Sequence, residues 1–123
     1  MKKVLILGAG LVARPLVRYL LDQPDFRVEV ASRTVSKAEK LIEGHPRGVA
    51  KELNLKSEEA LKNEVAGADL VISMVPYAFH PKVAELCIAY KKNMVTTSYV
   101  SDAMKKLDGD ARKAGIIILN ELG

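Results

Sequence analysis

The fold of this chain is decided near its N-terminus, by the stretch Lys3-Val4-Leu5-Ile6-Leu7-Gly8-Ala9-Gly10-Leu11-Val12-Ala13. Its apolar run is typical of a strand that is buried on both faces, and the run ends abruptly in a Gly-x-Gly-x-x-Ala turn. The residues that follow, from Leu11 to Leu21, are rich in helix formers, with Leu and Val at helical spacing. A strand, a glycine turn and a helix in this order are the context that a dinucleotide-binding motif requires.

Each small residue of this turn has a predicted role. Gly8 allows the chain to turn sharply off the strand, Gly10 leaves room for a pyrophosphate to approach the backbone, and Ala13 keeps the helix close to the sheet. The free N–H groups of the first helical turn then face the phosphates, and the helix dipole adds to the attraction. The alternative is a glycine turn that only lets a strand and a helix pack, but the order of the elements favours a binding site.

Composition places the chain among single-domain proteins. It has 123 residues, of which 49% are apolar, enough for one hydrophobic core. The single cysteine, Cys87, excludes an intramolecular disulfide and fits a reducing compartment, so we expect a cytoplasmic protein. No stretch is long and apolar enough to span a membrane, and the start of the chain does not resemble a signal peptide.

The charge pattern indicates which classes of partner the protein can bind. The net charge is +4, the basic residues are scattered along the chain, and aromatic residues are few. This pattern gives little support to a nucleic-acid surface, and we expect neither a nucleic-acid nor a membrane partner. A mildly positive chain also suits a phosphate-bearing cofactor.

Strands and helices alternate along the whole chain. Six strands are predicted, over residues 3–7, 27–32, 49–53, 70–73 with a continuation to 76, 93–96 and 116–119. Helices are predicted over 11–23, from a capping box at Ser36 and Glu39 to Gly44, from a Ser57 cap to 66, over 81–91 with Pro81 first, and over 101–114. This order predicts an α/β fold with a doubly wound, parallel six-stranded sheet in the strand order 3-2-1-4-5-6, a Rossmann NAD(P)-binding fold. Its ligand crevice is expected at the carboxyl ends of the first and fourth strands.

The turn after the second strand bears on the choice of cofactor. An NAD site usually has an acid there, which accepts a hydrogen bond from the ribose 2′-hydroxyl. This chain has Ser32-Arg33-Thr34 instead, and Lys37 follows one helical turn later. An arginine can bind a 2′-phosphate through two hydrogen bonds, and the two hydroxyl groups can donate to it. The alternative is a solvent-exposed arginine on a turn, but the missing acid and the adjacent hydroxyls favour NADP over NAD.

Two later loops follow strands and are expected to face the same crevice. Residues 74–81 carry two aromatic side chains, one histidine and two prolines, which suit a nicotinamide ring or a substrate, and residues 96–101 carry hydroxyl groups. His80 precedes a proline at a helix start, so we expect it to cap or pack rather than to catalyse. Cys87 lies between apolar residues of a helix and is expected to be a buried structural thiol.

Other chemistry finds little support. Asn54 ends the third strand and is expected near the adenosine. The spacing of histidine, cysteine and acidic residues predicts no metal site, and no nucleophile-elbow motif occurs in the sequence. No residue stands out as the catalytic acid or base.

Both loops resemble the saccharopine dehydrogenase family, in its glutamate-forming branch, also called saccharopine reductase. The segments that carry the resemblance are Leu70-Val71-Ile72-Ser73-Met74-Val75-Pro76-Tyr77-Ala78-Phe79-His80, Val95-Thr96-Thr97-Ser98-Tyr99-Val100-Ser101, Gly8-Ala9-Gly10-Leu11-Val12-Ala13-Arg14-Pro15, Ser32-Arg33-Thr34 and Asn120-Glu121-Leu122-Gly123. The resemblance implies an NADP(H)-binding domain of an oxidoreductase of lysine metabolism. That enzyme condenses glutamate with the semialdehyde of 2-aminoadipate and reduces the imine to saccharopine.

The resemblance also implies roles for individual residues. The expected cofactor-binding residues are Gly8, Gly10, Leu11, Val12, Ala13, Ser32, Arg33, Thr34, Asn54, Met74, Val75, Pro76, Thr97 and Ser98. The expected substrate-binding residues are Tyr77, Ser98 and Tyr99.

In that family a second domain follows the Rossmann domain and completes the substrate site and the dimer interface. We therefore expect residues 1–123 to form one cofactor domain, with the substrate domain and a possible homodimer contact outside it, and to be inactive alone. The alternative is a stand-alone nucleotide-sensing module that catalyses nothing. The loops at Tyr77–His80 and Ser98–Tyr99 favour the enzyme, because a sensor needs no hydroxyl groups facing a substrate.

Overall fold

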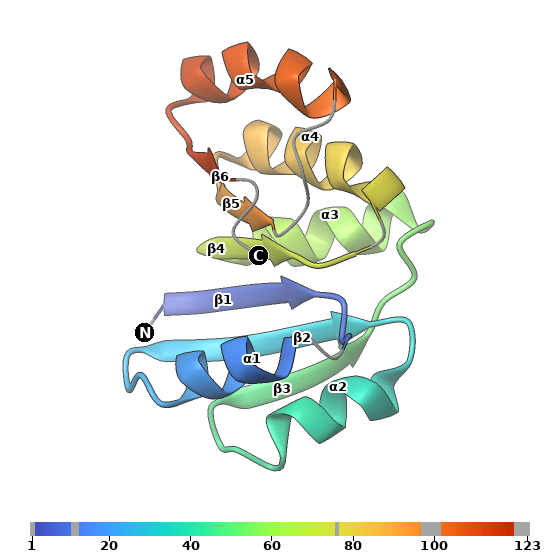
Figure 1. Cartoon of the computed structure of the whole chain (residues 1–123), viewed down its shortest axis with the longest axis vertical. Coiled ribbons are helices and arrows are strands. Elements are labelled where there is room, and N and C mark those ends of the chain that lie inside the picture. The colour runs from blue at the N-terminus through green and yellow to red at the C-terminus, as the bar shows by residue number, and fades with distance from the viewer. Residues whose placement is uncertain (1, 11–12, 76, 97–101, 120–123) are drawn as a thin grey trace.

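The computed structural model describes residues 2–10, 13–75, 77–96 and 102–119. Strands and helices alternate along the chain, with one extra turn of 3-10 helix before α4 (Figure 1). The elements are β1 (Lys2–Leu7), α1 (Ala13–Leu21), β2 (Phe26–Ser32), α2 (Val35–Ile42), β3 (Gly48–Glu52), α3 (Glu58–Ala66), β4 (Leu70–Ser73), the 3-10 helix (Tyr77–Phe79), α4 (His80–Tyr90), β5 (Asn93–Thr96), α5 (Asp102–Ala114) and β6 (Ile118–Leu119).

The predicted sheet is confirmed. Its six strands are all parallel and lie in the order β3-β2-β1-β4-β5-β6. The register aligns the ends of the central strands, since Leu7 of β1 pairs with Ala31 of β2 and with Ser73 of β4. The loops that follow β1, β2 and β4 therefore leave the sheet at the same edge.

Two hydrophobic cores cover the two faces of the sheet. Val4 and Ile6 of β1 pack with α1 and α2, whereas Leu5 and Leu7 pack with α3, α4 and α5. The four residues are at most 1% exposed. Because side chains alternate along a strand, the continuous apolar run of β1 supplies both cores, as expected for a central parallel strand. Burying each such side chain stabilises the fold by about 1.5–3 kcal/mol.

The glycine turn ends β1, and it also sets the length of β4. Gly8 has a φ of 102°, a left-handed conformation that favours glycine. The amide of Met74 still donates to the carbonyl of Leu7 at 2.8 Å, but beyond that point β1 has turned away. The predicted continuation of the fourth strand is therefore wrong at Met74 and Val75, because the pairing of β4 with β1 ends at Ser73, and Pro76 lies outside the described residues.

Two helix starts differ from prediction. α2 begins at Val35 with Thr34 as its N-cap, and the expected capping box at Ser36 and Glu39 is wrong. The reason is that the Ser32 hydroxyl accepts from the Thr34 amide at 3.2 Å, which closes the turn earlier. α4 begins at His80, so that Pro81 is its second residue. The cap of α3 is confirmed, since Ser57 accepts from the amide of Ala60.

A buried carboxylate stands in the middle of β2, where the sequence suggested no special role. Glu29 is 2% exposed, and its two carboxylate oxygens lie 2.6 Å from Lys3 Nζ and 3.1 Å from Lys51 Nζ. Lys51 also lies 3.3 Å from a carboxylate oxygen of Glu64 in α3. These ion pairs join three strands and one helix.

Candidate functional site

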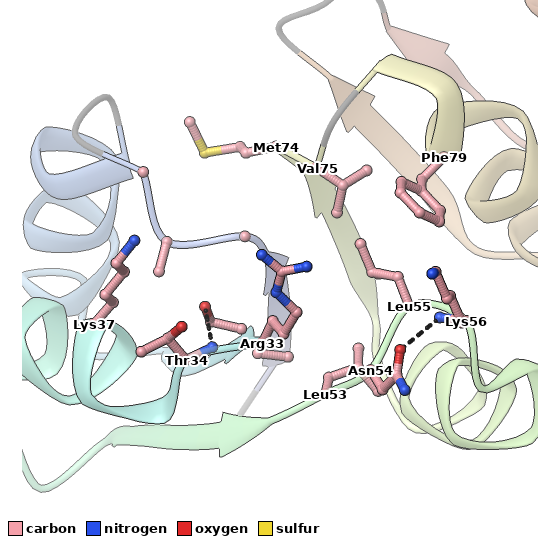
Figure 2. Close-up of a pocket in the computed structure, with 15 residues that line it drawn as sticks. Arg33, Thr34, Lys37, Leu53, Asn54, Leu55, Lys56, Met74, Val75 and Phe79 are labelled. Atoms are coloured by element: carbon pink, nitrogen blue, oxygen red, sulfur yellow. Dashed lines mark hydrogen bonds between the residues drawn. The ribbon is translucent and has the colours of Figure 1, made fainter.

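The loops at the carboxyl ends of the strands enclose a pocket of about 310 Å³ (Figure 2). Loops after β1, β2, β3 and β4 supply its walls, as the doubly wound topology requires. The lining residues are Gly8, Ala9, Gly10, Ala31, Ser32, Arg33, Thr34, Lys37, Leu53, Asn54, Leu55, Lys56, Met74, Val75 and Phe79.

The two glycines of the turn are needed for different reasons. A Cβ atom at Gly8 would lie 2.7 Å from the carbonyl oxygen of Met74, so the fold itself requires glycine there. A Cβ atom at Gly10 would have no described heavy atom within 4 Å, and Gly10 is not among the glycines with positive φ. Among the described residues, neither packing nor backbone conformation explains Gly10. The space left by its missing side chain is open to the pocket, where a phosphate could approach the backbone.

Three cationic side chains line the pocket from the side of β2 and β3. They are Arg33 in the β2–α2 loop, Lys37 in the first turn of α2, and Lys56 in the β3–α3 loop. None of the three forms an ion pair with any residue that the structure describes. No described residue of the lining is acidic. The pocket is therefore suited to an anionic ligand.

Local hydrogen bonds shape the two loops that carry these cations. The turn at Ser32 and Thr34 is closed by the hydroxyl-to-amide bond described above. In the β3–α3 loop, the Asn54 side chain accepts from the amide of Lys56 at 3.0 Å (Figure 2). Short side chains that bond to the backbone two residues on are typical of such turns. These two hydrogen bonds fix the backbone next to Arg33 and Lys56, which both line the pocket.

One wall of the pocket is mainly apolar, and Lys56 lies on the same side (Figure 2). Leu55, Val75 and Phe79 lie on the side of the pocket away from Thr34 and Lys37 (Figure 2). Val75 is 6% exposed and belongs to the core beneath α3 and α4, so this wall is continuous with the hydrophobic core. A flat, weakly polar ring fits such a surface better than a charged group does.

His80 lies behind this wall. It is 2% exposed, its Nδ1 atom lies 2.9 Å from the Ser73 hydroxyl, and the Thr96 hydroxyl lies 3.4 Å from its ring nitrogens. Burial lowers the pKa of His80, so its neutral form is favoured. The prediction that His80 packs rather than catalyses agrees with this position. Cys87 is fully buried as predicted, and burial raises the pKa of its thiol to about 12.

The structure brings eight of the predicted cofactor residues to one pocket: Gly8, Gly10, Ser32, Arg33, Thr34, Asn54, Met74 and Val75. Ala13 is fully buried between α1 and the sheet, which matches its predicted packing role. Other predicted residues lie outside the described ranges, namely Leu11, Val12, Pro76, Thr97, Ser98 and Tyr99. For Tyr77 the structure describes the backbone only, as the first residue of the 3-10 helix.

Sequence reasoning missed Leu53, Leu55 and Lys56 as pocket residues. The available signal was the end of the third predicted strand, because all carboxyl ends of a parallel sheet lie at the same edge. Only Asn54 was selected from that loop. No group of three or more potential metal-binding side chains occurs in the part of the chain that the structure describes.

The pocket fits a dinucleotide that carries an extra phosphate. Gly10 leaves the backbone accessible, unpaired cations face the pocket at the end of β2, and no described acid occupies the position where NAD sites usually have one. A family model described as the saccharopine dehydrogenase NADP binding domain matches residues 4–119. The chain belongs to this family.

Members of the saccharopine dehydrogenase family resemble the chain over its whole length. Saccharopine dehydrogenase [NADP(+), L-glutamate-forming] from Pyricularia oryzae is 47% identical over 99% of this chain. The mitochondrial alpha-aminoadipic semialdehyde synthase of Bos taurus is 42% identical, also over 99%. The solved apo structure of the L-Glu-forming saccharopine dehydrogenase from Saccharomyces cerevisiae superposes with a TM-score of 0.91 and 40% identity over the entire chain.

The family assignment makes this chain an NADP-binding domain. It spans 27% of the Pyricularia protein, 13% of the Bos taurus protein and 27% of the yeast chain. Nothing in these comparisons supports a regulatory sensor. Among the described helices, none is long and apolar enough to cross a membrane.

Proposed function

We propose that this chain is the cofactor-holding part of an NADP-dependent oxidoreductase that interconverts saccharopine with glutamate and α-aminoadipic semialdehyde. The observation that carries the proposal is the pocket that Gly10 and Arg33 both line, in which no described lining residue is acidic and Arg33 has no ion-pair partner among the described residues. The substrate class comes from the printed names of the relatives, which are saccharopine dehydrogenases and semialdehyde synthases.

The position of the cofactor follows from the general arrangement of dinucleotides in this fold. The adenosine half lies over the β1–β3 half of the sheet, and the nicotinamide half lies over the β4–β6 half. We assign the 2′-phosphate to Ser32, Arg33 and Thr34, the pyrophosphate to Gly8 and Gly10–Ala13, and the adenosine to the loop around Asn54. Met74, Val75, Pro76, Thr97 and Ser98 are assigned to the nicotinamide half.

The bound cofactor supplies hydride chemistry, and the chain supplies its position. In the oxidative direction, a hydride would pass to the cofactor from a carbon beside the secondary amine of saccharopine, and the nitrogen would lose its proton. Water would then hydrolyse the resulting imine to glutamate and the semialdehyde. We propose Tyr77, Ser98 and Tyr99 as substrate contacts. The family resemblance supports Ser98 and Tyr99, and the place of Tyr77 in the loop after the fourth strand supports Tyr77.

We propose that a second domain in the parent protein completes the substrate pocket and, if the enzyme is a homodimer, provides its interface. The greater length of the relatives supports this. The three cations of the described lining follow β2 and β3, on the side that our proposal assigns to the 2′-phosphate and the adenosine. Gripping the carboxylates of an amino-acid substrate therefore requires further cationic groups.

We propose a cytoplasmic location, without nucleic-acid or membrane partners. Support comes from the single buried cysteine, which suits a reducing compartment. The Bos taurus relative is named as mitochondrial, so the two compartments are to be distinguished by imaging the tagged parent protein. Exclusive mitochondrial signal would contradict the proposal.

Two measurements test the proposed function. Calorimetric titration of the chain should show binding of NADPH and weaker binding of NADH. Absorbance at the NADPH band, with saccharopine and NADP⁺ supplied, should rise only when the chain is joined to the remainder of its parent protein. Robust turnover by the 123 residues alone would contradict the divided substrate site. An extended protein that binds NADPH but leaves saccharopine unchanged would exclude the substrate proposed here.

A further inference from the structure

Three polar side chains meet inside the apolar second half of the molecule. Ser73 ends β4, Thr96 ends β5, and His80 begins α4, and these residues are 0%, 0% and 2% exposed. His80 Nδ1 lies 2.9 Å from the Ser73 hydroxyl, and the Thr96 hydroxyl lies 3.4 Å from both ring nitrogens. We call these three residues the Ser73–His80–Thr96 cluster.

An apolar core of the same shape can be as stable as one that contains a buried hydrogen bond. Replacing both partners of a buried hydrogen bond by apolar groups of the same shape is often nearly neutral. A satisfied polar cluster instead imposes one geometry, because each donor must meet its acceptor at a fixed distance and angle. The cluster is therefore suited to fixing the shape of the chain between its members.

Several residues between Ser73 and His80 belong to the lining of the pocket. Ser73 and His80 are seven positions apart in the sequence. Met74, Val75 and Phe79 lie between them, and all three line the pocket. The 3-10 helix at Tyr77–Phe79 turns the chain back toward β4, which brings the His80 ring onto Ser73. The hydrogen bond thus joins the two ends of a loop whose apolar residues line the pocket.

We propose that His80 is a positioning residue for the nicotinamide half of the cofactor. Its bond to Ser73 holds Met74, Val75 and Phe79 in the positions in which they line the pocket on the side of that half. The inference rests on the proposed binding mode, in which the β4 side of the pocket holds the nicotinamide. His80 acts through this loop, since its own ring is buried behind the wall.

The experiment compares two probes, NADPH and adenosine 2′,5′-bisphosphate, which lacks the nicotinamide half. In His80→Leu the loop loses its closing bond, and NADPH affinity should fall about tenfold, the scale of one buried hydrogen bond. Affinity for the bisphosphate should change by less than about twofold, because its contacts lie on the β1–β3 side. His80→Asn keeps a polar nitrogen or oxygen near the position of Nδ1 and should restore most of the NADPH affinity.

Ser73→Ala removes the other partner of the same bond. It should lower NADPH affinity in the same direction as His80→Leu, and the double variant should lose no more NADPH affinity than His80→Leu alone, because the bond between Ser73 and His80 is already absent in His80→Leu. The matched control is Cys87→Ala, which removes a buried side chain from the same helix away from the pocket. It should lower thermal stability and leave both affinities unchanged.

Equal losses for the two probes in His80→Leu would overturn the inference, because they would indicate general damage to the fold. Unchanged NADPH affinity in a folded His80→Leu protein would overturn it as well. If the unmutated chain binds NADPH no more tightly than the bisphosphate, the nicotinamide half adds no affinity. The inference then fails, while the adenosine site remains. Binding of neither probe would exclude the proposed function, and the inference with it.

Discussion

The two halves of the sheet contribute side chains of different chemistry to the pocket. The β1–β3 half presents Arg33, Lys37 and Lys56, three exposed cations without a described ion-pair partner. The β4–β6 half presents Val75 and Phe79 from a loop whose ends are joined by a buried hydrogen bond.

The difference teaches that the halves select a ligand by different means. Exposed cations recognise charge and can adjust their positions, since long side chains in solvent have several rotamers. A buried apolar wall recognises shape, and its geometry depends on the packing behind it. Substitutions in the first half should therefore change the preference between NADPH and NADH. Substitutions in the second half should change how tightly the nicotinamide ring binds.

The largest effect is expected at Gly10, where the two halves meet. Gly10→Val should weaken NADPH binding by about 3 kcal/mol, at the upper end of the usual cost of overpacking a tight contact. The fold should be retained, because the new side chain points into open space. Calorimetry and circular dichroism on one sample separate the two effects.

Gly8→Ala is the contrasting variant for this test. Its Cβ atom would meet the Met74 carbonyl at 2.7 Å with φ at 102°, so it should lower the melting temperature even without ligand. A Gly10→Val protein that binds NADPH normally would show that the turn serves packing only.

The next effect is expected at Arg33 and concerns the choice between cofactors. Arg33→Ala should reduce the preference for NADPH over NADH by about 2 kcal/mol, the scale of hydrogen bonds to a charged group. Titration of both cofactors measures this difference, with Arg27→Ala as a control for an exposed arginine of β2 that does not line the pocket. If NADPH and NADH weaken equally, the first half does not select by charge, and the comparison between the halves breaks down.

Lys56 should have a smaller influence. Lys56→Ala should weaken NADPH by about 0.5 kcal/mol, since an exposed charge is screened by water and salt. The effect should shrink at high salt, and Lys62→Ala, an exposed lysine of α3 outside the pocket, should show none. A salt-independent loss would assign Lys56 a shape-dependent role more typical of the second half.

The smallest effect is a pH dependence of stability that originates in the second half. The pKa of His80 is lowered from its ordinary value of 6.5 by burial, so the unfolded chain binds the proton more readily than the folded chain. The His80 contribution to stability is therefore fully present above about pH 6.5 and is lost as the pH falls through the lower pKa of the folded state. Thermal unfolding across this range should show the loss, and His80→Asn should not. An identical pH profile for the two proteins would contradict the assignment.

Sequence reasoning found pocket residues in both halves, and the missed residues Leu53, Leu55 and Lys56 follow β3 in the first half. Gly8, Gly10 and Arg33 were identified because their roles depend on local chain geometry and on which residue types are present or absent at a turn. The wall at Leu55 and the lysine at Lys56 were missed, because their place in the pocket depends on where β3 ends relative to β2. His80 was expected to pack, but its partners, Ser73 and Thr96, come from two different strands.

By itself the sequence determined the alternation of strands and helices, the strand order, the glycine turn and the absence of an acid after β2. These features depend on hydrophobic periodicity, the right-handed crossover and the conformational freedom of glycine, all of which act over short distances along the chain. Only the tertiary structure decided that Lys3 and Lys51 neutralise a buried Glu29, that Gly8 is required by Met74, and that His80 closes the loop behind the pocket. Each of these contacts joins residues from different strands or loops, and their distances exist only after the sheet has assembled in its register.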